Sequence, residues 1–182
     1  MGAVEALREA LPDVARDIRL NLQTVMQTPN LTGAQRYGVA IATAAATRDT
    51  VLHDALIADA RGELGQGVID DALAAAALMA MTNVYYRFRH LVGKQSYAEM
   101  PARLRMNRLG SPAASKLDFE LFALAVSAVN GCEVCVQAHE RVLVTGGMSE
   151  EQIHDAVRIA AVVHATASAR LIGTLVAASA AA

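Results

Sequence analysis

The residues most able to do chemistry in this chain are its only two cysteines and a histidine that follows them. Cys132 and Cys135 stand three residues apart, and His139 stands four residues beyond Cys135. Residues three and four apart share one face of a helix, so we expect the three side chains to lie together. Thiols one turn apart can close a small disulfide, and a nearby base or a helix N-terminus favours the reactive thiolate. This spacing is typical of a dithiol redox catalyst.

Three other interpretations of the cysteine pair compete with redox chemistry. Buried cysteines can simply fill an apolar core, but chance seldom places the only two at redox spacing with a histidine one turn on. A structural zinc site needs four ligands, so His154 or His164 would have to complete one here. A static structural disulfide over so short a loop would constrain the unfolded chain little. The residues therefore favour redox chemistry, and we expect no metal.

The composition is that of a globular protein. Hydrophobic residues make up 54% of the 182 residues and charged residues 19%, and the net charge is −2. No run of Lys or Arg suggests nucleic acid. The N-terminus lacks a basic and apolar leader, and the longest uncharged apolar stretch, Ala72–Tyr86, is too short to span a membrane. We therefore expect a cytoplasmic protein that binds neither membrane nor nucleic acid, in which a C-x-x-C pair is catalytic.

Apolar residues recur at helical spacing along nearly the whole chain, and no window alternates as a strand would. The sequence therefore predicts an all-α fold. Asp118 is expected to cap a helix that begins at Phe119, and residues 93–115, rich in Gly and Pro, are expected to form an irregular connector. Helices are expected over 4–11, 14–27, 32–46, 49–62, 68–91, 119–130 and 132–145 and from 149 onward.

The chain also shows weak similarity to itself. An offset of 84 residues aligns Arg36–Val84 with Glu120–Ser168 without a gap and places Asp71 on Asp155. Two unrelated helical stretches remain the alternative explanation. We interpret residues 1–182 as a single domain with an internal two-fold repeat. Its parts are N-terminal helices over 1–35, a degenerate repeat over 36–92 and a catalytic repeat over 116–178.

The chemistry of such a repeat would belong to its second copy alone. Arg48 aligns with Cys132 and Val51 with Cys135, so the first copy has no thiol to activate. We expect it to act as a scaffold.

The residues around the cysteines match a longer pattern. Glu120 precedes Cys132 by twelve positions, which gives the motif E-x11-C-x2-C-x3-H. The chain resembles the alkylhydroperoxidase (AhpD) family, which belongs to the carboxymuconolactone decarboxylase-like superfamily, and the resemblance implies an all-α helical bundle. Further segments that resemble the family are Asp17–Leu22, Ala44–Arg48, Asn83–Arg87 and Leu104–Asn107.

The resemblance implies a role for each residue of the motif. Cys135 would attack the hydroperoxide and become a sulfenic acid, and Cys132 would resolve it as a disulfide and later exchange with the reductant. His139 and Glu120 would form the proton relay. Some members carry a histidine between the cysteines where this chain has Val134, so any contribution of that ring is absent here.

The spacing gives this relay a physical basis. His139, one turn from Cys135, can accept its proton, and Glu120 could orient the imidazole as the third member of a catalytic triad does. For Glu120 the alternative is a solvated carboxylate at a helix start. We expect Arg87 to be solvated and His164 to be a core or site-lining residue.

The resemblance also implies a function and its partners. The protein would be an antioxidant peroxidase that reduces alkyl hydroperoxides, and also hydrogen peroxide or peroxynitrite, without a bound cofactor. Electrons would come from the lipoyl group of a lipoylated acyltransferase with its dihydrolipoamide dehydrogenase. The protein would also recycle an AhpC-type peroxiredoxin and form a homotrimer. The alternatives are a non-catalytic thiol redox sensor or regulator, and a decarboxylase or lactone-processing relative, which does not need a dithiol.

Overall fold

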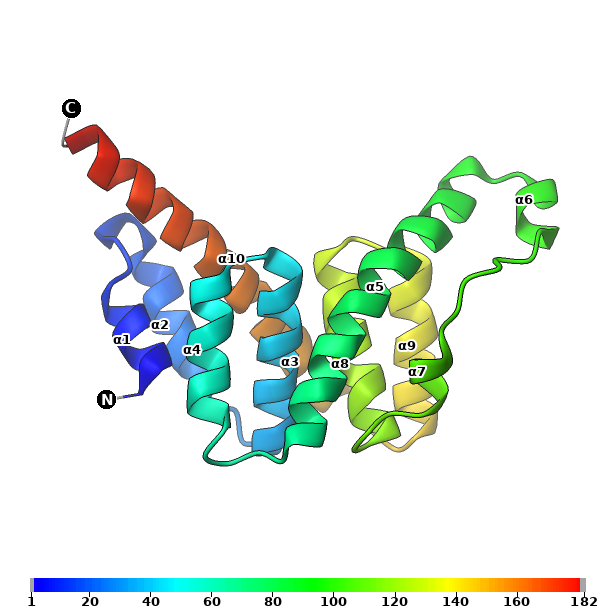
Figure 1. Ribbon diagram of the computed structural model, residues 1–182, viewed down its shortest axis with the longest axis horizontal. Helices are drawn as coiled ribbons and strands as arrows, with labels where there is room; N and C mark the ends of the chain where they lie inside the picture. The colour runs from blue at the N-terminus through cyan, green and yellow to red at the C-terminus, as the bar shows by residue number, and fades with distance from the viewer. Residues whose placement is uncertain (1, 181–182) are drawn as a thin grey trace.

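The computed structural model describes residues 2–180, which form helices joined by short turns and one longer connector, with no strand among them (Figure 1). The predicted all-α fold is confirmed. The elements are α1 (Ala3–Glu9), a 3-10 turn (Asp13–Ala15), α2 (Arg16–Val25), α3 (Gly33–Thr47), α4 (Thr50–Ala60), α5 (Gln66–Val92), α6 (Gln95–Glu99), α7 (Asn107–Gly110), α8 (Lys116–Val129), α9 (Glu133–Thr145) and α10 (Glu150–Ala180).

The start of α8 differs from the prediction. Asp118 was expected to cap this helix, but the helix begins at Lys116, and the Ser115 hydroxyl accepts a hydrogen bond from the Asp118 N–H at 3.2 Å. A serine before the helix reaches the third free N–H of the first turn, so Ser115 is the cap and Asp118 lies inside the turn. The connector before it is also more ordered than expected, because it contains α6 and α7.

The central helix of the fold is α8. Every residue from Phe119 to Ser127 is buried, and the helix packs against α3, α5, α9 and α10. Phe122 packs against Gly38 of α3, where a Cβ atom would lie 2.1 Å from the Phe122 ring. The apolar run Leu121–Val126 therefore reflects a helix with neighbours on all sides, as expected for a helix without a polar face.

The helices α5 and α10 are both longer than the uncharged apolar stretches that the sequence contains at these places. The length and hydropathy of Gln66–Val92 and Glu150–Ser179 would suffice to cross a membrane. The expectation based on Ala72–Tyr86 counted only uncharged residues, whereas α5 continues past charged residues at both ends. Buried core helices pass the same test, and α5 packs against α3 and α8 in the core.

The offset of 84 residues reappears in the helix boundaries. It carries the first residues of α3, α4 and α5 to within one residue of the first residues of α8, α9 and α10. Each half is thus a run of three helices of similar lengths. The duplication itself stays a prediction.

Two buried carboxylates connect the halves reciprocally. Asp71 of α5 accepts hydrogen bonds from the backbone N–H groups of Ala113 and Ala114, both at 2.8 Å, just before α8. Asp155 of α10 accepts from the hydroxyl of Thr28 and, at 2.9 Å, from the amide of Asn30, just before α3. Each carboxylate therefore belongs to the third helix of one half and holds the segment that leads into the other half.

Asp155→Asn is expected to lower the free energy of unfolding by about 1–3 kcal/mol at pH 7, because a charged acceptor is lost from a buried site. The Thr28 hydroxyl, followed by Asn30 and Arg158, lowers the pKa of Asp155 below its ordinary value. A carboxylate whose pKa is lower in the folded than in the unfolded protein stabilises the fold at pH values above its unfolded-state pKa. This stabilisation is lost as the pH falls, here from about pH 5 downward. Urea unfolding across pH 3–7 measures both effects.

The exposed Asp70→Asn is the matched control, since it removes a helical carboxylate outside this contact. The difference between wild type and Asp155→Asn should shrink as the pH falls from about 5. An equal difference at every pH would contradict the assigned ionisation.

Candidate active site

The turn between α8 and α9 places the first cysteine. Gly131 has a φ of 65°, a conformation that glycine adopts at little cost, and the N–H of Cys132 donates to the Ser127 carbonyl at 3.0 Å. The Gly131 N–H donates to the Ala128 carbonyl at 3.1 Å. This pair of bonds is the Schellman arrangement that ends a helix. As a result Cys132 becomes the N-cap residue of α9.

The two cysteines are joined in the structure. The Cys132 and Cys135 sulfurs form a disulfide of 2.00 Å, with the Cα atoms 5.3 Å apart. Cys132 is fully buried, whereas 7% of Cys135 is exposed. The structure therefore represents the oxidised protein, and Cys135 is the more exposed residue of the pair.

The predicted histidine and glutamate meet beside this disulfide. His139 lies one turn beyond Cys135 on α9, and its Nδ1 lies 2.6 Å from Oε2 of Glu120 on α8. Each of the two side chains is 12% exposed. The interpretation of Glu120 as a solvated carboxylate is therefore wrong. With Nδ1–H donating to the carboxylate, Nε2 is the nitrogen available for proton exchange.

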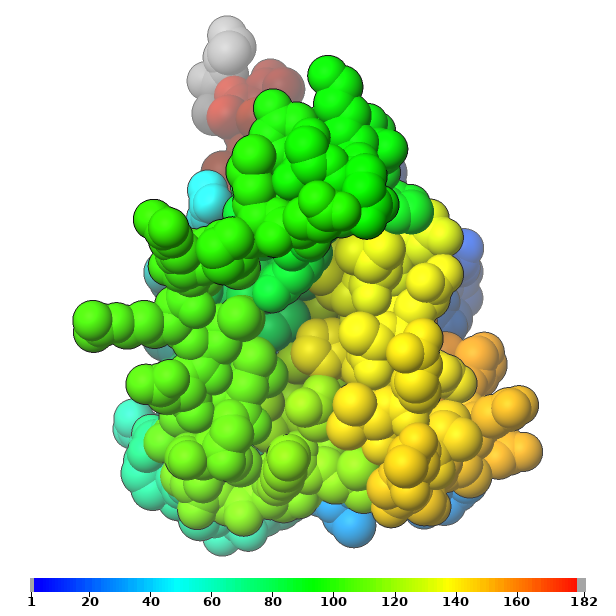
Figure 2. Space-filling view, turned by 90° about the vertical axis from the view of Figure 1, so that its right-hand side faces the viewer, coloured from blue at the N-terminus to red at the C-terminus, as the bar shows by residue number. Residues whose placement is uncertain are grey.

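A cavity of about 360 Å³ lies against Cys135 and His139. Its walls are formed by α5, α7 and α9, and on the face shown in Figure 2 the green connector adjoins the yellow α9. The lining residues, mostly apolar, are Met79, Thr82, Tyr86, Met106, Leu109, Val134, Cys135, Ala138 and His139. The residues from α5 and the connector were not predicted. The apolar side chains of Met106 and Leu109 within a segment of breakers were the only available signal.

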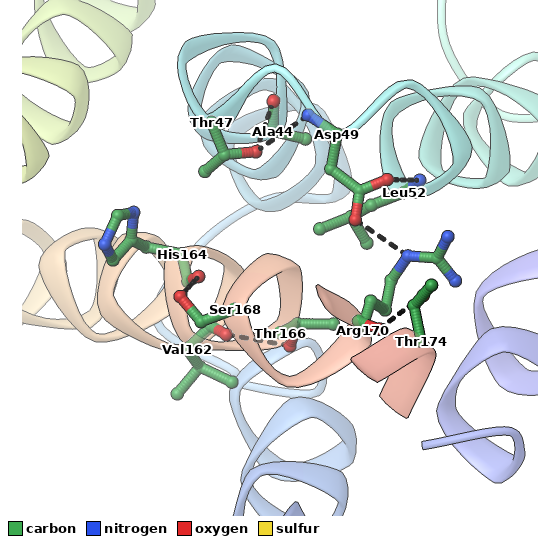
Figure 3. Close-up of polar contacts among 10 residues, drawn as sticks. All are labelled: Ala44, Thr47, Asp49, Leu52, Val162, His164, Thr166, Ser168, Arg170 and Thr174. Carbon is green, nitrogen blue, oxygen red and sulfur yellow. Dashed lines mark hydrogen bonds and ion pairs between the residues drawn. The ribbon is translucent and has the colours of Figure 1, made fainter. Parts of the chain in front are cut away.

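Arg87 and His164, which were given no catalytic role from the sequence, have surroundings other than those expected. Arg87 donates to the carbonyl of Asn130, next to the cysteine turn, and is not merely solvated. His164 is exposed and not in the core; it lines a separate open pocket with Arg48. Figure 3 shows that region, where Asp49 caps α4 through the N–H of Leu52 at 3.1 Å and pairs with Arg170.

The zinc alternative required His154 or His164 beside the thiols. Both histidines are exposed on α10. Within residues 2–180, no group of three His, Cys, Asp or Glu side chains is placed to hold a metal ion.

Sequence comparison agrees with this arrangement. Residues 95–178 match the carboxymuconolactone decarboxylase family. A protein named alkyl hydroperoxide reductase AhpD from Anaeromyxobacter dehalogenans strain 2CP-C is 69% identical over 183 residues, which covers 100% of this chain and 98% of that protein. A relative of the same name from Rhodospirillum centenum is 51% identical over 166 residues, covering 91% and 89%.

Fold and site together define an all-helical protein whose paired cysteines lie beside a hydrogen-bonded histidine and glutamate. The chain belongs to the alkyl hydroperoxide reductase AhpD family.

Proposed function

We propose that this protein is an antioxidant dithiol peroxidase that reduces alkyl hydroperoxides, and also hydrogen peroxide or peroxynitrite. One observation carries the proposal: Cys135 lies at an apolar cavity beside the bonded His139–Glu120 pair. An apolar cavity suits the organic group of a hydroperoxide, and the histidine supplies the proton exchange that thiol attack requires. The name shared by the relatives supports the same chemistry.

In the reduced protein, His139 takes the proton of the Cys135 thiol, and Glu120 stabilises the imidazolium that results. The thiolate attacks the terminal oxygen of the hydroperoxide, so that an S–O bond forms and the O–O bond breaks. His139 returns its proton to the alkoxide, which leaves as the alcohol. Cys132 then attacks the sulfenic sulfur of Cys135, water departs, and the disulfide seen here results.

The disulfide must be reduced by an external dithiol. We assign this role to the dihydrolipoyl group of a lipoylated acyltransferase, itself reduced by dihydrolipoamide dehydrogenase, so the protein needs no bound cofactor. The reduced protein would in turn recycle an AhpC-type peroxiredoxin. All of these reactions are assigned to the cytoplasm.

The test is turnover of an alkyl hydroperoxide with dihydrolipoamide as reductant. We expect sustained turnover, and we expect one equivalent of peroxide to consume two thiols per chain, because the first half has Arg48 and Val51 in place of cysteines. Thiol oxidation without turnover would favour the redox sensor instead. Loss of fewer than two thiols per chain would contradict the single dithiol site.

Leu109→Asp is expected to lower kcat/KM for cumene hydroperoxide by about 10-fold or more, because a charge in the cavity wall disfavours an apolar substrate. Hydrogen peroxide has no organic group, so its kcat/KM should change far less. Leu109 is only partly buried, and the fold should tolerate the change. Steady-state kinetics with both peroxides measure the ratio.

The control is Leu20→Asp, an exposed leucine on α2 outside the cavity. It should leave the ratio of the two kcat/KM values unchanged. Equal losses for both peroxides in Leu109→Asp would show that the cavity does not select the organic group.

We also propose a homotrimer. Large apolar side chains are exposed along the second half of α10, where Leu171 is 62% exposed and Leu175 59%. Exposed apolar surface of this kind marks interfaces between chains. Light scattering at micromolar protein is expected to give three times the mass of one chain, 19.2 kDa. A monomer mass would contradict the assembly.

A further inference from the structure

A buried polar network connects α5 to the turn between α8 and α9, which carries Cys132. Asn83 of α5 is 1% exposed, and its amide nitrogen donates to the Ser127 hydroxyl at 2.9 Å. Its amide oxygen accepts from the side chain of Asn130 at 2.9 Å. Both ends of the Asn83 amide are thus bonded to α8 and its C-terminal cap.

The two residues held by Asn83 are the ones that build the turn. The Ser127 carbonyl receives the N–H of Cys132, and Asn130 is the cap residue of α8. Arg87, one turn beyond Asn83 on α5, donates to the Asn130 carbonyl. Two side chains of α5 therefore hold the turn.

The same network reaches the wall of the cavity. The Ser127 hydroxyl donates to the sulfur of Met79 at 3.3 Å, and the Thr82 hydroxyl contacts that sulfur at 3.5 Å. Met79 lines the cavity beside Cys135. The contacts thus extend from the turn that carries Cys132 to the cavity that Cys135 lines.

If position 83 served only for packing, an apolar side chain would be expected at this buried site. A buried amide loses its bonds to water, and this loss is offset only when its donors and acceptors are paired in good geometry. A fully paired buried network fixes one arrangement of its members. The arrangement fixed here is the position of Cys132 relative to the first turn of α9.

We propose that Asn83 is a positioning residue for the dithiol. Through Ser127 and Asn130 it holds the turn so that the Cys132 sulfur stays within reach of Cys135 after the disulfide opens. Holding two reacting groups together raises their effective concentration, which favours disulfide formation and speeds resolution of a sulfenic acid. The proposal rests on the proposed dithiol chemistry, but its first measurement needs no peroxide.

The test is the equilibrium between the protein and a glutathione redox buffer, read by mass spectrometry after alkylation. Asn83→Ala is expected to lower the equilibrium constant for disulfide formation about tenfold, equivalent to a midpoint potential about 30 mV less negative. Ser127→Ala, which deletes a single hydroxyl, should change it in the same direction by less. Ser127→Thr restores a hydroxyl and should return the constant toward the wild-type value.

A second measurement is the share of Cys135 that reaches sulfinic acid per turnover with peroxide. This share should rise several-fold in Asn83→Ala. Thr166→Val is the control, because within the described part of the chain this buried hydroxyl bonds only the Val162 carbonyl of its own helix. It should alter stability without changing either measurement.

Thermal unfolding identifies a variant that fails to fold, and in that case Ser127→Ala alone decides. Lower stability with an unchanged glutathione equilibrium and unchanged sulfinic acid formation would overturn the proposal and leave Asn83 a structural residue. If the wild-type protein shows no peroxidase turnover but Asn83→Ala still alters the glutathione equilibrium, the proposed function is rejected and the positioning role is kept.

Discussion

Cys135→Ser is expected to abolish peroxidase turnover, with a loss on the order of 10³-fold or more. A serine hydroxyl does not ionise near neutral pH and cannot replace the thiolate as nucleophile. Cys135 is the cysteine that lines the cavity, whereas Cys132 is fully buried. Steady-state turnover with an alkyl hydroperoxide measures the loss.

The matched variant is Cys132→Ser, which keeps the nucleophile and removes its resolving partner. It should react once with peroxide, after which Cys135 should proceed to sulfinic acid. Intact-mass spectrometry after one and after several equivalents of peroxide separates these states. Turnover retained in Cys135→Ser, with overoxidation at Cys132, would reverse the two roles.

His139→Phe is expected to lower kcat/KM by about 10²–10⁴-fold, the usual contribution of a positioned acid or base. Phenylalanine fills a similar space but cannot exchange a proton. Glu120→Gln should cost less, because an amide oxygen can still accept from Nδ1, which lies 2.6 Å away from the carboxylate in the wild type. The rate of Cys135 alkylation against pH should show a smaller thiolate fraction at neutral pH in both variants.

His154→Phe provides the control, since this histidine is exposed on α10. It should change neither the alkylation profile nor the turnover. If His139→Phe and Glu120→Gln behave like this control, the proposed proton relay is wrong.

The site was predictable because most of it is local. Cys132, Cys135 and His139 lie within two turns of one helix, so the helical period alone brings them together. Glu120 lies on the preceding helix, and only the longer motif distinguished it from a solvated carboxylate. The all-α fold followed in the same way from a periodicity that reports on local structure.

What escaped prediction depends on contacts between residues remote in sequence. The cavity combines Tyr86 of α5 and Leu109 of the connector with α9, and no periodicity relates these segments. Asn83 is similar, because its partners Ser127 and Asn130 lie more than 40 residues away. The cap at Ser115 was missed for a different reason: two residues that can cap a helix stand close together, and the folded structure selects between them.

The reciprocal contacts of Asp71 and Asp155 bear on how modular this protein is. The matched domain spans residues 95–178, but α8 within it is buried partly by α3 and α5, which lie outside it. The carboxylate of Asp155 likewise finds Thr28 and Asn30 outside that domain. Residues 95–178 therefore do not supply all of the contacts that bury α8. A fragment of residues 95–178 would expose the faces of α8 that α3 and α5 cover here, and we expect it to associate through them.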